Sequence, residues 1–377
     1  RSWLERSLNT PSVSIESVPV TDTISLHEAG NTIHDGKRNP VIDSIDNPIF
    51  IIGSGRSGTT LLRMMLNAHP NIYISHEASY YLFKPKARTS GEWLDFYERT
   101  VSFLWMKFSR QEIEKHIPRD LPQHEIHQVF DALMRIKATH YNKNHYGDKT
   151  PSYSWYLKRI LADFLNAKII HIVRDPVATA TSMRGMPWTP GSIVLISLLM
   201  AMQTSRVEKY KDRILEVRLE DLLESPEAIM RRMLGFVGEE WDDQVLRHQE
   251  FAPLNDMPPF PWFATAQRKA TTDTGLTATV LPNLTRAEKI VVEYINRNII
   301  RRFGYRRAPF KLSTLLTVFL YVVSDIPLMC LDFIRMAHVL VGMRNVKDAR
   351  ELLWPDEDAW KYYPDFNLHD VTEWEDE

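Results

Sequence analysis

The chain has 377 residues, which is long enough for one large α/β domain with additions. A formal net charge of −2 argues against a general nucleic-acid-binding surface, and 44% hydrophobic with 25% charged residues is ordinary for a globular protein. The single cysteine, Cys330, excludes an internal disulfide and any Cys/His metal cluster, and it favours a reducing compartment such as the cytoplasm.

Composition divides the chain into three parts. Residues 1–47 are polar and rich in Ser, Thr, Asn and Asp, so we expect a partly ordered N-terminal arm. Residues 48–308 carry the strand and helix patterns of the main domain. Residues 309–377 begin as an apolar helical extension and end as an acidic tail.

The main domain opens with the stretch IFIIGSGRSGTTLLRMML, which begins at Ile49. Residues 49–52 predict a buried strand, and an amphipathic helix is expected to start at Thr59. The glycine-rich turn between them would aim backbone N–H groups and a positive helix end at one point, which predicts a phosphate site. The residues expected to surround that phosphate are Gly55, Arg56, Ser57, Gly58, Thr59 and Thr60.

The turn differs from that of nucleotide triphosphatases, which reads G-x-x-x-x-G-K-S/T. Gly53 and Gly58 keep that spacing, but Thr59 occupies the lysine position and Arg56 lies inside the turn. The site therefore suits a 5′-phosphate without a γ-phosphate. A P-loop nucleotide or small-molecule kinase remains an enzymatic alternative, and a nucleotide-binding scaffold without catalytic activity remains a non-enzymatic one.

Further strand patterns at 71–75, 145–151, 167–175 and 213–218 alternate with helix patterns. This predicts a P-loop-like three-layer α/β/α fold with a parallel central sheet flanked by helices, a helical insertion over about 79–144 and a helical C-terminal extension. A helix with a capping box is predicted over 285–303. Glu77, Lys149 and Arg174 each follow a predicted strand, so we expect them to meet at one sheet edge.

The loop G-x-G-R-S-G-T-T resembles the 5′-phosphosulfate loop of sulfotransferases that use 3′-phosphoadenosine 5′-phosphosulfate. The stretch from Arg56 to Glu77 resembles tyrosylprotein sulfotransferases most closely, and related bacterial and carbohydrate sulfotransferases as well. The resemblance implies that Glu77 is the general base, with His76 as the rival base. A structural alternative makes Glu77 the cap of a helix that starts near Ser79.

Other residues extend the resemblance. Arg174 and Ser182, in RDPVATATS, match the pair that binds the 3′-phosphate, although a salt bridge between Arg174 and Asp175 is the structural alternative. Lys149 in GDKTP matches a lysine that neutralises charge on the leaving oxygen, together with Arg56. The structural alternatives are a solvated loop lysine and a lysine that has Asp148 as its structural partner. In RLEDL, Leu219 stands where these enzymes usually have tyrosine.

The long irregular segment 251–284 faintly resembles a basic lid that closes over the 3′-phosphate. Its candidate donor-binding residues are Arg268 and Lys269. The aromatic candidates for acceptor contacts are Tyr80, Tyr81, Trp155, Tyr156, Trp188, Trp262 and Phe263. For each of these aromatics, a place in the core is the alternative.

The sequence as a whole predicts a sulfotransferase that moves a sulfuryl group from 3′-phosphoadenosine 5′-phosphosulfate to an acceptor hydroxyl without a metal. The product would be 3′,5′-diphosphoadenosine, and sugar, phenol, lipid and peptide tyrosine all remain candidate acceptors. The apolar segment 310–343 has three interpretations: a helical pair packed on the core or on a twin subunit, a membrane-surface element, or a lid over a lipophilic pocket.

Overall fold

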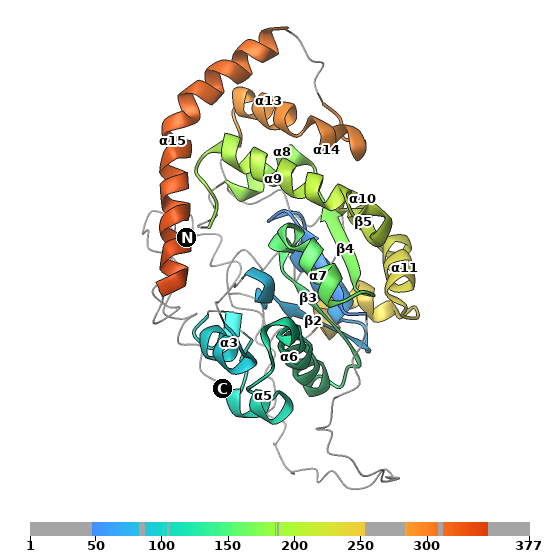
Figure 1. The fold of residues 1–377 in the computed structure, drawn as a ribbon. Helices are drawn as coiled ribbons and strands as arrows, with labels where there is room; N and C mark the ends of the chain where they lie inside the picture. The colour runs from blue at the N-terminus through green and yellow to red at the C-terminus, as the bar shows by residue number, and fades with distance from the viewer. Residues whose placement is uncertain are drawn as a thin grey trace, which may run out of the picture. The chain divides into compact units, whose positions relative to one another are not determined.

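The structure is a computed structural model, and a five-stranded parallel sheet forms its centre (Figure 1). The structure describes residues 47–345, apart from gaps at 83–86, 101, 104–105, 185, 187, 253–282 and 308–311. The expected N-terminal arm up to residue 46, the acidic tail from 346, and the candidates Arg268 and Lys269 therefore lie outside the described residues.

The sheet has the order β2-β3-β1-β4-β5, and all the pairings are parallel, as predicted. The chain leaves β1 toward one edge for β2 and β3, and toward the other edge for β4 and β5. Strand order reverses between β1 and β4, and ligands of such folds bind at the carboxyl ends of the strands beside that reversal. The strands are β1 (Ile49–Gly53), β2 (Ile72–His76), β3 (His145–Lys149), β4 (Lys168–Val173) and β5 (Ile214–Arg218).

Helices cover both faces of the sheet because alternate residues of each strand point to opposite sides. Ile49 and Ile51 pack with α2 (Thr59–Asn67) and α11 (Pro226–Val237) on one face. Phe50 and Ile52 pack on the other face with α6 (His127–His140) and α7 (Leu157–Asp163). The predicted three-layer architecture is confirmed.

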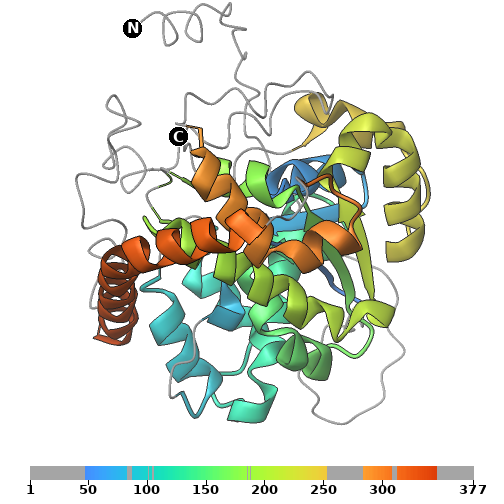
Figure 2. The ribbon, with the colours of Figure 1, turned by 90° about the horizontal axis from the view of Figure 1, so that it is seen from above.

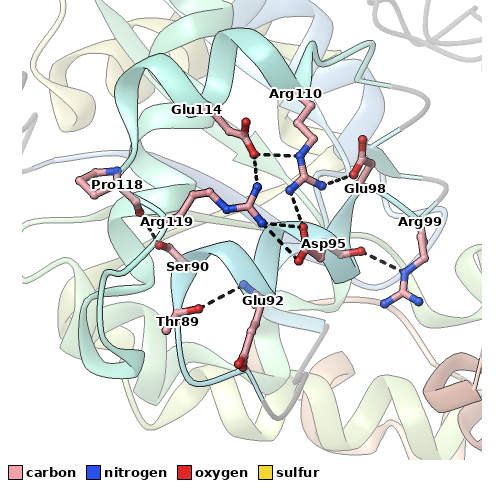
Figure 3. A network of polar contacts seen from close by, with 10 residues as sticks. All are labelled: Thr89, Ser90, Glu92, Asp95, Glu98, Arg99, Arg110, Glu114, Pro118 and Arg119. Carbon is pink, nitrogen blue, oxygen red and sulfur yellow. Dashed lines mark hydrogen bonds and ion pairs between the residues drawn. The ribbon is translucent and has the colours of Figure 1, made fainter.

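The predicted helical insertion between β2 and β3 is also confirmed. It contains α3 (Ser90–Tyr97), α5 (Arg110–His116) and α6. Arg110 of α5 contacts the carboxylates of Asp95 from α3, of Glu98 directly after α3, and of Glu114 from its own helix (Figure 3). A three-way arginine contact of this kind fastens α5 to α3 at the surface.

The remaining elements include α8 (Pro176–Met183) and α9 (Ile193–Glu208), which follow β4. The helix predicted over 285–303 is two helices, α13 (Arg286–Ile295) and α14 (Arg297–Arg302), with the predicted capping box at Thr285. They separate at Asn296, whose side-chain amide donates to the Val292 carbonyl at 3.0 Å. The other elements are η1 (Tyr80–Leu82), η2 (Gln123–Glu125), η3 (Pro151–Trp155), η4 (Lys211–Arg213), α10 (Leu219–Glu224), η5 (Asp243–Arg247) and α12 (His248–Phe251).

The C-terminal extension contains one long helix, α15 (Leu312–Asn345), which packs against α13 and α9 (Figure 1, Figure 2). Of the three interpretations of 310–343, the helical pair is wrong. A single helix continues through Pro327, where a break between two helices would be expected. The lost N–H of a proline removes one backbone hydrogen bond, and Asp325 and Asp332 bind Ser192 at the N-terminus of α9 from either side of that position. The part Leu312–Arg335 is long and apolar enough to cross a membrane.

Candidate active site

The glycine-rich turn after β1 is held by close packing and local hydrogen bonds. Gly58 has a φ of 99°, and a Cβ there would lie 2.6 Å from a methyl group of Leu219. The Ser57 hydroxyl donates to the Ser54 carbonyl at 2.7 Å. Thr59 is the first residue of α2, as predicted, so the helix N-terminus points into the turn. Leu219, which replaces the usual tyrosine, thus packs against the turn.

Arg56 lies at the centre of the turn in a left-handed conformation, with a φ of 65°. Its Nε donates to the Ser182 hydroxyl at 3.1 Å, and its carbonyl accepts from Arg174 Nη1 at 3.1 Å. Two cationic side chains and a buried hydroxyl from three separate elements therefore converge at the end of β1 and β4. Two arginines and a serine with oriented backbone N–H groups nearby have the chemistry to bind an anion.

The structural alternative for Arg174, a salt bridge with Asp175, is not formed between these two described residues. The Asp175 carboxylate instead caps α8 by accepting from the Ala178 N–H at 2.8 Å. The Asp175 N–H itself donates to Glu220 at 2.9 Å. These contacts hold the β4–α8 turn and leave the Arg174 side chain directed at the Arg56 carbonyl.

Glu77 and Lys149 form the second part of the site. Lys149 Nζ donates to Glu77 Oε1 at 2.5 Å, and the Glu77 N–H donates to the Lys149 carbonyl at 3.0 Å. The lysine side chain is fully buried whereas the glutamate side chain is 31% exposed, so the carboxylate is the member of the pair that solvent or a ligand can reach. Burial lowers the pKa of Lys149, and the Glu77 charge opposes that shift.

Glu77 has a φ of 51°, which is a strained conformation for a residue that is not glycine. Its side chain binds Lys149 and does not cap the short η1 helix, so the predicted capping alternative is wrong. His76, the rival base, is fully buried on the same sheet face as Ile72 and Ile74. Burial holds the pKa of His76 well below its ordinary value, with Lys149 and Arg63 adding to the effect.

Asp148 has a positioning role that differs from the predicted structural partnership with Lys149. Its carboxylate accepts from the Ala78 N–H at 3.0 Å, from the Thr150 hydroxyl at 2.8 Å and from the Ser75 hydroxyl. These bonds tie the end of β3 to residues on both sides of Glu77. The sequence contained one signal for this role, because Asp148 directly precedes Lys149 at the end of a buried strand. Burial raises the pKa of Asp148.

The aromatic candidates for acceptor contacts divide into groups. Tyr80 and Tyr81 are fully buried in an aromatic cluster with Phe50 and Phe130, so both belong to the core. Trp155 and Tyr156 are half-buried at the junction of η3 and α7. Trp188 is 38% exposed, and its indole Nε1 would lie 4.0 Å from a Cβ at Gly55. Trp262 and Phe263 lie outside the described residues.

The residues around the glycine-rich turn and the Glu77–Lys149 pair lie at the carboxyl ends of neighbouring strands. Lys149 at the end of β3 pairs with Ile51 of β1, two residues before the turn begins at Gly53. Gly53 of β1 pairs with Ile172 of β4, two residues before Arg174. The fold and this edge together define a P-loop-like α/β protein whose glycine-rich turn carries an arginine and has a carboxylate–lysine pair beside it.

Comparison with known proteins specifies the family. The model of the family described as "Sulfotransferase family" matches residues 48–243, which is just over half of the chain. The chain belongs to the sulfotransferase family. The match spans β1 to β5 and therefore includes Arg56, Glu77, Lys149, Arg174 and Ser182.

Individual relatives agree with the family match. The chain is 30% identical to the protein-tyrosine sulfotransferase of Drosophila melanogaster over 223 residues, 54% of this chain and 40% of that protein. It is 30% identical to protein-tyrosine sulfotransferase 1 of Danio rerio over 242 residues, 60% of this chain and 62% of that protein. The chain thus spans about half the length of the relatives that it matches.

Solved structures show the same fold. The sulfotransferase domain of the olefin synthase from Synechococcus PCC 7002 superposes with a TM-score of 0.53 at 22% identity, covering 72% of this chain and all of that one. The sulfotransferase domain from the curacin biosynthetic pathway gives a TM-score of 0.50 at 20% identity, covering 71% of this chain and all of that one.

Proposed function

We propose that this protein transfers a sulfuryl group from 3′-phosphoadenosine 5′-phosphosulfate to an acceptor hydroxyl. The observation that carries the proposal is the convergence of Arg56, Arg174 and Ser182 at the glycine-rich turn, with Thr59 where a nucleotide triphosphatase has lysine. The turn would hold the 5′-phosphosulfate at the start of α2. Arg174 and Ser182 would hold the 3′-phosphate, which ATP lacks.

The proposed reaction is an in-line displacement at sulfur. The acceptor oxygen forms a bond to sulfur while the bond from sulfur to the bridging phosphate oxygen breaks. Glu77 accepts the hydroxyl proton, and Lys149 and Arg56 offset the negative charge that grows on the leaving oxygen. The 2.5 Å contact between Lys149 and Glu77 supports this assignment, because it brings base and cation within one hydrogen bond.

His76 is the less suitable base. Its ring is fully buried, so an acceptor hydroxyl would have to enter the packed region beneath the sheet edge to reach it. Glu77 is partly exposed at that edge. The proposal requires no metal ion, since the cations are side chains.

Donor selectivity separates this proposal from the kinase alternative. We expect 3′,5′-diphosphoadenosine to raise the thermal unfolding temperature. At 100 times its Kd, the ligand should add about 2.7 kcal/mol to the free energy of unfolding. Magnesium-ATP at the same concentration should have a much smaller effect. Stabilisation by magnesium-ATP alone would refute the proposal in favour of a kinase. A protein that binds the diphosphate but transfers nothing would be a scaffold.

The acceptor and the division of the chain are also proposals. The names of the relatives from Drosophila and Danio make a peptide tyrosine the first acceptor to test, before phenols, sugars and lipids. We place the catalytic domain at residues 48–308 and treat 309–377 as an extension. We expect the protein to act in the cytoplasm or at a membrane surface that faces it.

A further inference from the structure

The outer face of α15 is unusually apolar. The described residues include sixteen exposed large hydrophobic side chains, and eleven of them lie on this helix. They are Leu312, Leu315, Leu316, Phe319, Leu320, Val323, Ile326, Leu328, Leu331, Phe333 and Ile334. Since single exposed apolar residues are ordinary but a continuous apolar patch is not, this face calls for a partner.

The inner face of α15 has a different character. The only charged residues from 312 to 334 are Asp325 and Asp332, which are 7% and 3% exposed. Asp325 accepts from the Ser192 hydroxyl and from the Val194 N–H at 3.3 Å. Asp332 accepts from the N–H groups of Gly191 and Ser192 at 3.2 and 2.9 Å. Both carboxylates thus bind at the N-terminus of α9, where the helix dipole favours negative charge.

This arrangement leaves the outer face without any charge over roughly 35 Å of helix. Apart from Leu328, the exposed apolar side chains occupy an arc of roughly 160° around the helix axis, since successive residues are about 100° apart. The face is therefore broad, convex and uncharged. Hydrocarbon needs no polar partner groups and adapts to a convex surface, whereas a typical protein interface carries about ten hydrogen bonds.

Exposed cations border the apolar face along the chain. Arg306 and Arg307 precede α15, and Arg335 follows the apolar stretch. Positive charge on both sides of this uncharged apolar stretch of the sequence complements the anionic headgroups that surround a hydrocarbon layer. We propose that α15 lies in the plane of a lipid bilayer surface, with its outer face immersed and the domain remaining on one side.

The docking of α15 argues against a helix that crosses the bilayer. A crossing would separate α15 from α13 and α9 and carry the carboxylates of Asp325 and Asp332 into hydrocarbon, where charged groups are strongly disfavoured. An in-plane helix keeps both carboxylates bound to α9 and buries only the side chains that are already uncharged.

The test is binding of the full chain to phosphatidylcholine vesicles with and without phosphatidylglycerol, measured by flotation. We expect binding to both, with higher affinity for the anionic vesicles. Phe319→Glu should weaken binding by about tenfold or more, because it removes a large apolar contact and adds a charge to the immersed face. Leu165→Glu is the matched control: Leu165 is 71% exposed against 64% for Phe319, lies between α7 and β4, and should change nothing.

Cys330 provides an independent probe of the same face. It is the single cysteine of the chain and is exposed on α15. Vesicles should slow its reaction with a membrane-impermeant maleimide, and a polarity-sensitive dye on it should be quenched best by quenchers near the headgroups. Thermal unfolding verifies that Phe319→Glu remains folded, and Leu316→Glu replaces it if it does not.

Three results would overturn the proposal. The first is an absence of vesicle binding, or binding that Phe319→Glu and Leu316→Glu leave unchanged. The second is a stable dimer in solution that Phe319→Glu dissociates, with Cys330 protected before vesicles are added, which would make a second copy of the chain the partner. The third is quenching of the dye chiefly from the bilayer centre, which would indicate a spanning helix.

Discussion

Ser182 tests the donor site at the scale of a single hydroxyl. Its Oγ accepts from Arg56 Nε and, in the proposed complex, would donate to the 3′-phosphate. A hydrogen bond to a charged group contributes about 1.5–3 kcal/mol, so Ser182→Ala should weaken 3′,5′-diphosphoadenosine binding by roughly 10- to 100-fold. Adenosine 5′-phosphate, which lacks the 3′-phosphate, should bind equally to both proteins. Isothermal titration calorimetry measures all four affinities.

A second serine supplies the control for that experiment. Ser197 is buried on α9, and its hydroxyl bonds to the Ile193 carbonyl of its own helix at 2.7 Å. Ser197→Ala should leave both affinities unchanged. Equal losses of diphosphate and monophosphate affinity in Ser182→Ala would contradict a role specific to the 3′-phosphate.

The pKa of Lys149 should set the alkaline limit of activity. An ammonium group offsets charge only while protonated, and burial lowers the pKa of Lys149 below the ordinary value of about 10.5. Because the charged form exists below this pKa, kcat should fall with rising pH before pH reaches about 10.5. The pH profile of kcat at saturating donor and acceptor measures this limb. A profile that stays flat through the ordinary lysine range would contradict the role of Lys149.

For individual residues, the sequence predicted which side chains belong to the site better than it predicted their contacts. Arg56, Arg174 and Ser182 were predicted as one donor site, and they do lie together. The hydrogen-bond partners of Asp148 were not predictable, because Ser75 and Ala78 are far from it along the chain. The core positions of Tyr80 and Tyr81 depend likewise on Phe130 of a distant helix.

The glycine-rich turn makes a prediction at the scale of one element. Gly58→Ala would force a side chain into a φ of 99° and within 2.6 Å of Leu219. The cost of the left-handed conformation alone is about 1–3 kcal/mol, so the free energy of unfolding should fall by at least that amount. Urea denaturation measures it, and a fall of less than about 0.5 kcal/mol would contradict the strained turn.

Gly235 provides the matched glycine for that measurement. It lies inside α11, and a Cβ there would meet no atom within 4 Å. Since alanine has the higher helix propensity, Gly235→Ala should raise the free energy of unfolding by about 0.5–1 kcal/mol. The two substitutions are chemically identical and differ in sign because of local backbone conformation and space.

Elements with a local signal were predicted well. The strand–turn–helix of β1 and α2 and the capping box at Thr285 follow from adjacent residues. The break at Asn296 and the continuity of α15 through Pro327 were missed. In α15, propensity alone favours a break at proline, whereas hydrogen bonds from Ser192 of the α9 N-terminus to Asp325 and Asp332 hold the helix on both sides of it.

At the scale of the whole molecule, sheet order determines how the site assembles. Four strands end at one edge in the order β2-β3-β1-β4, and each contributes one part of the site. Those parts are Glu77, Lys149, the turn around Arg56, and Arg174. The convergence could be predicted because parallel strands end at one edge, whereas the strand order itself depends on pairings between distant residues.

Transfer of radiolabelled sulfate from 3′-phosphoadenosine 5′-phosphosulfate tests the central claim most directly. The acceptors would be a tyrosine peptide, p-nitrophenol and a sugar, and the controls would be Glu77→Gln and Glu224→Gln, an exposed glutamate on α10. We predict label on at least one acceptor with the wild type and Glu224→Gln, and a loss of about 100-fold or more with Glu77→Gln, which still binds 3′,5′-diphosphoadenosine. Equal transfer by Glu77→Gln, or transfer of phosphate from ATP in place of sulfate, would contradict the proposal.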